Sequence, residues 1–232
     1  TAIPEGVKPL NNSLLGPNIA VLPTEEEVLI KQDYKKCIVP APWIIKLYKK
    51  YIDEDKLAVW PVGIDTKLFN DFSKEKKAVD CLIYYKNRSA DELSLVIKLL
   101  EEFNQTYAVA MYGFYEEHEF INSIKKSKYC FLLNNTESQG LAVQEMMSSN
   151  LPMFVWDIDY WDGKGPDHIT PATSVPYWSE ICGRKIPALN AEANLKSEFK
   201  KFLSEMKDYN PREFILKNLT LEKQSAELIS LF

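Results

Sequence analysis

Two carboxylates, Glu137 and Glu145, stand with seven residues between them and with Gly140 inside the interval. Helix-forming residues after the glycine predict a helix that begins at Leu141. Unpaired N–H groups at a helix N-terminus bind phosphate, and glycine lets the phosphate come close. Glu145, about one turn into the helix, would then accept hydrogen bonds from ribose hydroxyls, and Glu137 would face a second sugar. The spacing alone is equally compatible with purely structural roles, in which Glu137 favours the helix dipole and Glu145 is a solvated surface residue.

The elements on either side place this turn at one edge of a parallel sheet. An apolar run at 129–133 predicts a buried strand that ends in the turn formers at 134–136. A helix is expected at 141–149, and a second apolar run at 153–156 predicts the next strand. In a strand-loop-helix-strand unit the loop lies at the carboxyl edge of the sheet, where open α/β sheets bind ligands.

Two basic residues and another glycine follow strands that end at the same predicted edge. Lys86 and Arg88 come after the strand expected at 79–85, and Gly113 follows the strand expected at 107–112. The two bases are suited to neutralising a diphosphate leaving group. The alternative is that they are two exposed loop charges.

These motifs resemble those of a known enzyme family. The segment Glu137 to Glu145, followed by Asn150-Leu151-Pro152 and a strand, is similar to the Glu-x7-Glu signature in the C-terminal domain of retaining GT-B glycosyltransferases, the group 1 type. The segment 60–69, Trp-Pro-Val-Gly-Ile-Asp-Thr-Lys-Leu-Phe, resembles their Pro-x-Gly-Val-Asp-x-x-x-Phe segment. The resemblance covers roughly residues 36 to 185.

The resemblance implies a role for each matching residue. Glu137 would contact the donor sugar, Glu145 the ribose, and Lys86 and Arg88 the diphosphate, so that Glu137, Lys86 and Arg88 are the expected catalytic residues. The family usually has a glycine followed by arginine, with a lysine several residues later, whereas the two bases here are two positions apart. The expected donor-binding residues are Glu145, Ser138, Gln139, Gly140, Leu141, Gly113 and Gly63. The resemblance also implies retention, no cofactor and no divalent metal.

A rival motif for metal-dependent sugar transfer follows the strand at 153–156. Asp157 and Asp159 form an Asp-x-Asp, the arrangement by which GT-A glycosyltransferases hold a divalent metal, because carboxylates supply hard oxygen ligands. We expect both to be loop residues near the cleft instead. His118 and His168 are expected to be exposed or structural.

Composition limits the classes of protein to which this chain can belong. The chain of 232 residues is 46% hydrophobic and carries a net charge of −5, which argues against a broad nucleic-acid-binding surface. The four cysteines are widely spaced, three of them in or beside apolar runs, which predicts buried thiols and a reducing compartment. No apolar run of the length of a membrane span and no secretory signal pattern is visible, so we expect a cytoplasmic protein.

The order of the predicted elements divides the chain into two parts. Residues 1–72 read as an irregular start followed by strands at 19–22, 37–39 and 57–60, with helices beginning near 24 and 42. Residues 73–232 read as a Rossmann-like, doubly wound parallel sheet that ends in helices at 195–206 and 211–232, and the last helix is expected to cross back over the N-terminal part. The segment 176–183 is left unassigned. The predicted class is therefore α/β, GT-B-type, with a truncated N-terminal α/β part whose helix face, Trp43, Leu47 and Tyr51, should pack onto the second part.

The sequence thus predicts a glycosyltransferase that moves a sugar from a nucleoside-diphosphate sugar to a glycan or other hydroxyl acceptor. The alternative is a noncatalytic nucleotide-sugar-binding domain that serves other domains of a longer polypeptide. Base, sugar, acceptor and oligomeric state are left open.

Overall fold

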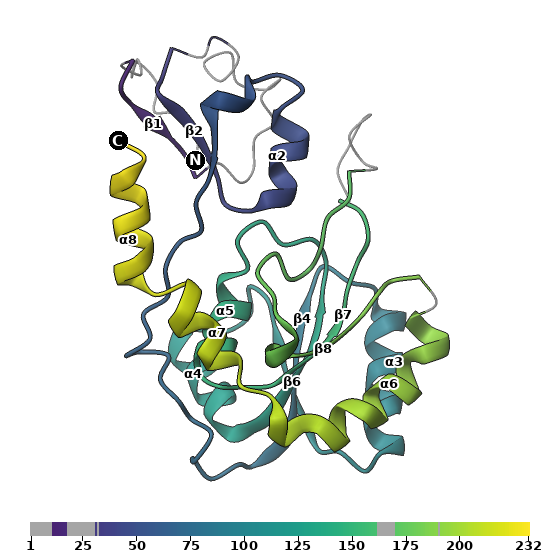
Figure 1. Ribbon diagram of the computed structural model, residues 1–232. Helices are drawn as coiled ribbons and strands as arrows, with labels where there is room; N and C mark the ends of the chain where they lie inside the picture. The colour runs from purple at the N-terminus through teal and green to yellow at the C-terminus, as the bar shows by residue number, and fades with distance from the viewer. Residues whose placement is uncertain (1–10, 18–30, 32, 162–169, 190) are drawn as a thin grey trace.

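The larger sheet contains five parallel strands in the order β5-β4-β6-β7-β8 (Figure 1). The computed structural model describes residues 11–17, 31, 33–161, 170–189 and 191–232. The strands of this sheet are β4 (Val79–Lys86), β5 (Tyr107–Met111), β6 (Ser127–Asn134), β7 (Met153–Trp156) and β8 (Gly183–Ile186). The first crossing runs outward from β4 to β5, and the chain then returns past β4 to build β6, β7 and β8 on its other side. This reversal makes the ends of β4 and β6 the switch point of the sheet, where ligands of open α/β folds bind.

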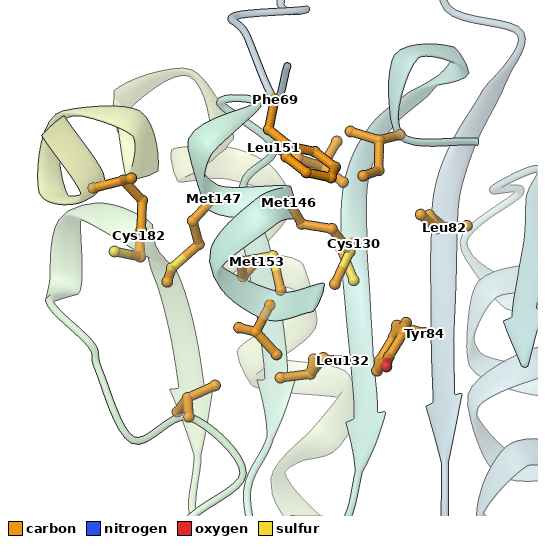
Figure 2. Close-up of a cluster of buried hydrophobic side chains, with 14 of the residues drawn as sticks. Phe69, Leu82, Tyr84, Cys130, Leu132, Met146, Met147, Leu151, Met153 and Cys182 are labelled. Atoms are coloured by element: carbon orange, nitrogen blue, oxygen red, sulfur yellow. The ribbon is translucent and has the colours of Figure 1, made fainter. Parts of the chain in front are cut away.

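Helices cover both faces of this sheet, as the doubly wound prediction requires. Helices α4 (Glu117–Lys126), α5 (Leu141–Ser148) and α7 (Pro211–Asn218) pack on one face, and α3 (Ala90–Glu102) and α6 (Ala191–Glu205) pack on the other (Figure 1). Because both faces are buried, the central strands are apolar at nearly every position. Figure 2 shows Met146 and Met147 of α5 lying against Cys130, Leu132 and Met153 of the sheet.

Local sequence signals explain where several helices begin. Ser89 accepts a hydrogen bond from the main-chain N–H of Glu92, whose carboxylate accepts one from the N–H of Ser89, which is the capping box expected for α3. Pro42 occupies the first turn of α2 (Pro42–Tyr48), where its missing N–H costs nothing. Thr220 caps α8 (Leu221–Ser230). The single helix expected at 211–232 is therefore two helices, α7 and α8.

The N-terminal part forms its own three-stranded parallel sheet, β1-β2-β3, from Leu14–Leu15, Lys36–Val39 and Leu57–Val59. Strand β1 lies in the stretch that we expected to be irregular, so that expectation was wrong. The strand and helix expected at 19–22 and near 24 lie outside the described residues. A short 3-10 helix at Glu54–Lys56 leads into β3.

The apolar face of α2 does not pack on the larger sheet. Leu47 and Tyr51 belong to a separate core that is built on β2, with Ile44 and Tyr48. This corrects the prediction that the face of α2 would bury itself against the second part, and the reason is that the small sheet has enough apolar side chains of its own to cover α2. Trp43 contacts this core as well, and its indole N–H donates to the main-chain oxygen of Glu137 at 2.8 Å.

The last helix crosses back to the N-terminal part, as predicted (Figure 1). The indole N–H of Trp60 donates to the main-chain oxygen of Gln224 in α8 at 2.8 Å, and Ile64 bridges to Thr220. Downstream of this contact, Phe69 and Phe72 are buried in the core of the larger sheet. The segment around the boundary expected at 72 and 73 is thus held against the larger sheet rather than extended into solvent.

The segment 176–183, which the sequence left unassigned, leads into an edge strand. Residues Glu180–Cys182 form a 3-10 helix that is followed by β8, which pairs with β7. A Cβ at Gly183 would lie 1.9 Å from the main-chain oxygen of Met153, so only glycine allows this approach. All four cysteines are buried and free, as expected.

Candidate functional site

Glu137 and Lys86 meet at the carboxyl edge of the larger sheet. Strands β4 and β6 are parallel neighbours whose last paired residues are Lys86 and Asn134. One carboxylate oxygen of Glu137 accepts hydrogen bonds from Lys86 Nζ at 2.7 Å and from Asn134 Nδ2 at 3.2 Å. The side chain of Glu137 is almost fully buried, and that of Lys86 is mostly buried. The expected acid and one expected base therefore form a close ion pair at the switch point.

The main chain of Glu137 is fixed by two segments that are distant in sequence. Its N–H donates to the main-chain oxygen of Thr173 at 3.0 Å, and its own oxygen accepts from Trp43 at 2.8 Å. The amide of Asn134 also donates to the main-chain oxygen of Ser174 at 3.3 Å. The segment 170–176 and the N-terminal part thus hold the loop that carries Glu137.

The loop leads into α5 through Gly140, as predicted. Gly140 is the N-cap residue with φ +71°, a left-handed conformation that favours glycine, and the first helical N–H that bonds back to it is that of Gln144. The N–H groups of the first turn of α5 therefore have no partner within the helix. Leu141 is exposed at this end, and Ser138 is half-buried in the loop before it.

Gln139 connects this loop to the segment before β4. Its side-chain oxygen accepts from the main-chain N–H of Val62 at 3.0 Å, and its main-chain oxygen accepts from Gln144 at 2.6 Å. The side chain of Gln139 is thus used to hold the loop.

Glu145 lies about one turn into α5, as the spacing predicted. It is half-buried, and burial, followed by the charge of Glu117, raises its pKa to about 7. Burial also raises the pKa of Tyr115, and the charges of Glu145 and Glu137 both add to this rise. Both carboxylates therefore act electrostatically on Tyr115.

Two tyrosines of this region were missed at the level of sequence. The Lys86 ammonium lies 4.3 Å from the centre of the Tyr112 ring, a cation–π contact, and the hydroxyl of Tyr115 donates to that of Tyr84 at 3.5 Å. Tyr112 directly follows β5, so its position at the carboxyl end of a predicted strand could have identified it as a site residue. Gly113, next to it, has φ +81° and open space where a Cβ would be.

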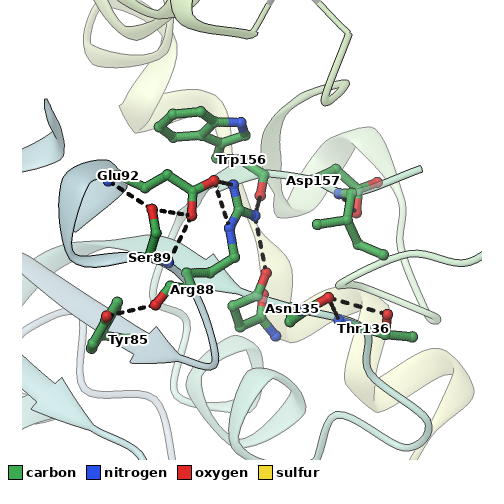
Figure 3. A network of polar contacts seen from close by, with 10 residues as sticks. Tyr85, Arg88, Ser89, Glu92, Asn135, Thr136, Trp156 and Asp157 are labelled. Atoms are coloured by element: carbon green, nitrogen blue, oxygen red, sulfur yellow. Dashed lines mark hydrogen bonds and ion pairs between the residues drawn. The ribbon is translucent and has the colours of Figure 1, made fainter. Parts of the chain in front are cut away.

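The structure places Arg88 away from Glu137. Its Nε and one terminal nitrogen donate to Glu92, and the other terminal nitrogen donates to the main-chain oxygens of Asn134 and Trp156, each at 3.2 Å (Figure 3). The guanidinium also lies 5.1 Å from the centre of the Trp156 ring, and only 6% of the side chain is exposed. Arg88 therefore ties together the ends of β6, β7 and α3, so Lys86 is the base that is left beside Glu137.

Gly63 is required for a structural contact. A Cβ there would lie 2.6 Å from the Cα of Leu221, so the glycine allows α8 to pack against the segment before β4. This close packing explains why residue 63 is a glycine, and no bound ligand is needed to explain it.

Asp157 acts as a structural anchor, and Asp159 is exposed. The carboxylate of Asp157 accepts from the hydroxyls of Thr173 and Ser174, from the N–H of Ser174 and from Lys185 at 3.1 Å. These bonds hold the segment 170–176 over the sheet edge. Within the described residues no cluster of three or more metal-ligating His, Cys, Asp or Glu side chains is found. His118 is exposed on α4, and His168 lies outside the described residues.

Two cavities open along the same edge. One of about 560 Å³ lies between the starts of α3 and α6 and is lined by Asn87, Arg88, Ser89, Glu92, Asn135, Trp156, Ile158, Ala188, Ala191 and Glu192. A second, of about 300 Å³, is lined by Asn87, Asn135, Thr136 and Trp161. The two cavities share Asn87 and Asn135.

Solved structures identify the class of fold. The chain has the fold of GT-B glycosyltransferases. It is similar to S. aureus TarM in complex with Fondaparinux, alpha-GlcNAc-glycerol and UDP, with a TM-score of 0.61, 13% identity, and coverage of 90% of this chain and 46% of that one. Sucrose-phosphate synthase from Thermosynechococcus elongatus gives a TM-score of 0.57 at 16% identity over 90% of this chain and 60% of that one.

A third similar structure is the lipopolysaccharide outer core galactosyltransferase WaaB, with a TM-score of 0.57, 11% identity, and coverage of 90% of this chain and 65% of that one. The chain thus spans from about half to two thirds of the length of these solved structures. No protein-family model matches the sequence. A sequence similarity to the protein pelota homolog of Thermococcus kodakarensis, 30% identical over 115 residues, covers 44% of this chain and 30% of that protein. At these identities the similar structures establish the fold alone.

Across the described residues, no helix has both the length and the apolar character needed to cross a membrane.

Proposed function

We propose that this chain is the donor-binding part of a glycosyltransferase that moves a sugar from a nucleoside-diphosphate sugar, such as a UDP-sugar, to a hydroxyl acceptor. The observation that carries the proposal is the ion pair of Glu137 and Lys86 at the switch point of a GT-B fold, in the loop that leads through Gly140 into α5, the helix that carries Glu145. This set combines a cation, a helix N-terminus and two separated carboxylates, which suits one diphosphate with a sugar on each side.

In this proposal the diphosphate lies at the N-terminus of α5 beside Lys86. The helix start supplies N–H donors and a positive dipole end, and Lys86 supplies a full charge. Lys86 would exchange its contact with Glu137 for the phosphate oxygens when the donor binds. Glu145 would accept hydrogen bonds from the ribose hydroxyls, and Glu137 would then face the donor sugar.

The reaction breaks the bond between C1 of the donor sugar and the diphosphate oxygen and forms a bond between C1 and an acceptor oxygen. The acceptor proton goes to the departing diphosphate, and positive charge develops on the sugar in the transition state. Lys86 and the helix dipole would stabilise the leaving group, and the carboxylate of Glu137 would stabilise the cationic sugar. We propose that the configuration at C1 is retained and that no divalent metal is needed.

A noncatalytic nucleotide-sugar-binding domain is the second candidate. It is favoured by the ion pair that occupies both Glu137 and Lys86. In this second candidate the chain would serve other domains of a longer polypeptide. The four buried free thiols suit a reducing compartment, so we propose a cytoplasmic location.

Calorimetry with UDP, GDP and ADP, combined with a donor-turnover assay, tests the proposal. Glu145→Ala should weaken both the preferred nucleotide and its sugar conjugate about ten- to a hundredfold, since a hydrogen bond to a charged group is worth about 1.5 to 3 kcal/mol. Glu137→Ala should bind the free nucleotide like the wild type and lose turnover. Glu101→Ala, an exposed carboxylate on α3, is the matched control.

If both site variants bind nucleotide like the wild type, the site assignment is wrong. If wild-type protein binds the nucleotide-sugar with no turnover in the presence of any hydroxyl acceptor, the noncatalytic function replaces the catalytic one.

A further inference from the structure

We infer that the two cavities along the sheet edge form one groove that holds an uncharged glycan chain, the acceptor of the proposed transfer. We call this the edge groove and define it by Asn87, Ser89, Glu92, Asn135, Thr136, Trp161 and Glu192. That this glycan is the acceptor of a transfer rests on the proposed function. The groove and the class of its ligand rest on the structure alone.

The groove follows from the sheet. Asn87 follows β4 and Asn135 follows β6, and because the two strands are parallel neighbours, both amides reach the same edge. Both asparagines line the larger cavity, toward α3 and α6, and the smaller one, toward Trp161. Together the volumes of about 560 and 300 Å³ fall in the range of small-molecule sites, about 300 to 1,000 Å³.

One end of the groove reaches the candidate donor site. Thr136, which lines the smaller cavity, directly precedes Glu137. Trp161, on the same cavity, lies 6.5 Å from Trp43, ring centre to ring centre, and Trp43 donates to the main chain of Glu137. A chain lying in the groove would therefore bring its end next to the loop that carries Glu137, the residue that we assign to the donor sugar.

The charges of the lining select the class of ligand. Arg88 is the cation among the lining residues, and its guanidinium is occupied by Glu92 and two main-chain oxygens (Figure 3). Glu192, at the far end, is exposed and acidic. A phosphorylated or sulfated ligand would meet this carboxylate, and Arg88, the cation among the lining residues, is already paired with Glu92, so the like-charge contact is unfavourable.

The polar groups suit hydroxyls. The amide of Asn87 can both donate and accept, the amide nitrogen of Asn135 can donate while its oxygen accepts from Thr136, and Glu192 accepts. Trp161 adds a half-buried indole, an apolar surface with a polar edge, at the end near the donor site. Alternating donors, acceptors and an aromatic ring match the vicinal hydroxyls and apolar ring faces of a neutral sugar.

The test uses two groove variants chosen to leave the fold intact. Asn87→Gly removes the amide and keeps the left-handed conformation, φ +52°, that the residue adopts. Glu192→Ala removes an exposed carboxylate near the start of α6. Glu101→Ala on α3, outside the groove, is the matched control. None of these residues belongs to the proposed donor site.

Binding is measured on the whole chain by saturation-transfer NMR, without donor, using uncharged tetrasaccharides of glucose and of N-acetylglucosamine and one sulfated tetrasaccharide. We expect an uncharged tetrasaccharide to bind and the sulfated one not to bind. Each groove variant should weaken binding about two- to tenfold, the value of one hydrogen bond, and UDP affinity by calorimetry should be unchanged. Glu192→Lys should give measurable binding of the sulfated probe.

Three results would overturn the inference: no uncharged tetrasaccharide binds, the sulfated probe binds the wild type better, or the groove variants bind like the control. Donor turnover together with any of these would leave the proposed function intact. Saccharide binding that depends on the groove, with no nucleotide binding to the wild type, would overturn the proposed function and leave the groove assignment standing.

Discussion

Replacing Glu145 by glutamine should stabilise the folded protein at neutral and alkaline pH while weakening nucleotide binding. Burial and the neighbouring Glu117 raise the pKa of Glu145 from 4.5 to about 7. The folded state therefore holds a proton on this carboxyl between about pH 4.5 and 7 that the unfolded state has released. Since stability falls with rising pH wherever the folded state binds more protons, the wild type loses stability through this window.

The size of the effect follows from the shift. At about 1.4 kcal/mol per pKa unit, the rise in pKa corresponds to at most about 3.5 kcal/mol at pH 8, and solvent screening of the half-buried carboxylate reduces this to about 1 to 2 kcal/mol. Glutamine has nearly the same shape and carries no charge, so Glu145→Gln should recover that amount. A chain of this length gains about 2 to 4 °C in Tm per kcal/mol.

Thermal unfolding at pH 4, 6 and 8 measures the effect. The variant should unfold at a higher temperature than the wild type at pH 8, less so at pH 6, and at the same temperature at pH 4, where the carboxyl is protonated in both states. Glu117→Gln should give a smaller gain, because the charge of Glu117 is the lesser cause of the shift. A gain that is equal at all three pH values, or absent at pH 8, would refute the electrostatic reasoning.

Three further predictions concern the same edge and its supports. Arg88→Ala should lower the free energy of unfolding by about 2 to 4 kcal/mol in urea titrations, because it removes charge-assisted bonds to Glu92 and two main-chain oxygens. Lys86→Ala should instead mainly weaken UDP binding in calorimetry. The reverse pattern would contradict our assignment of the two bases. Gly63→Ala should destabilise the protein more than Gly113→Ala does. A Cβ at position 63 would lie 2.6 Å from a main-chain atom, whereas a Cβ at position 113 would meet nothing within 4 Å. Equal losses of stability would argue against the packing of α8 on this segment. Donor turnover should persist in EDTA, and loss that manganese or magnesium restores would favour a metal-dependent reaction.

Much of the fold could be predicted from local patterns. The apolar runs, the capping box at Ser89 and the glycine at position 140 each report on a few neighbouring residues, and they predicted strands β4 to β7 and helices α3 to α5 close to their observed bounds. Parallel pairing then places every strand exit at one edge, which is why the order of the elements was enough to predict that Glu137 and Lys86 lie near each other.

The sequence by itself determined the class of fold and the loop before α5, because these depend on residues that are close along the chain. Only the tertiary structure decided which partners the charged groups take. Arg88 is bound to Glu92 and to carbonyls of two other strands, Asp157 anchors a segment about sixteen residues further on, and α2 is covered by its own small sheet. Hydrogen bonds and packing of this kind join residues far apart in sequence, and neither residue type nor spacing encodes their geometry.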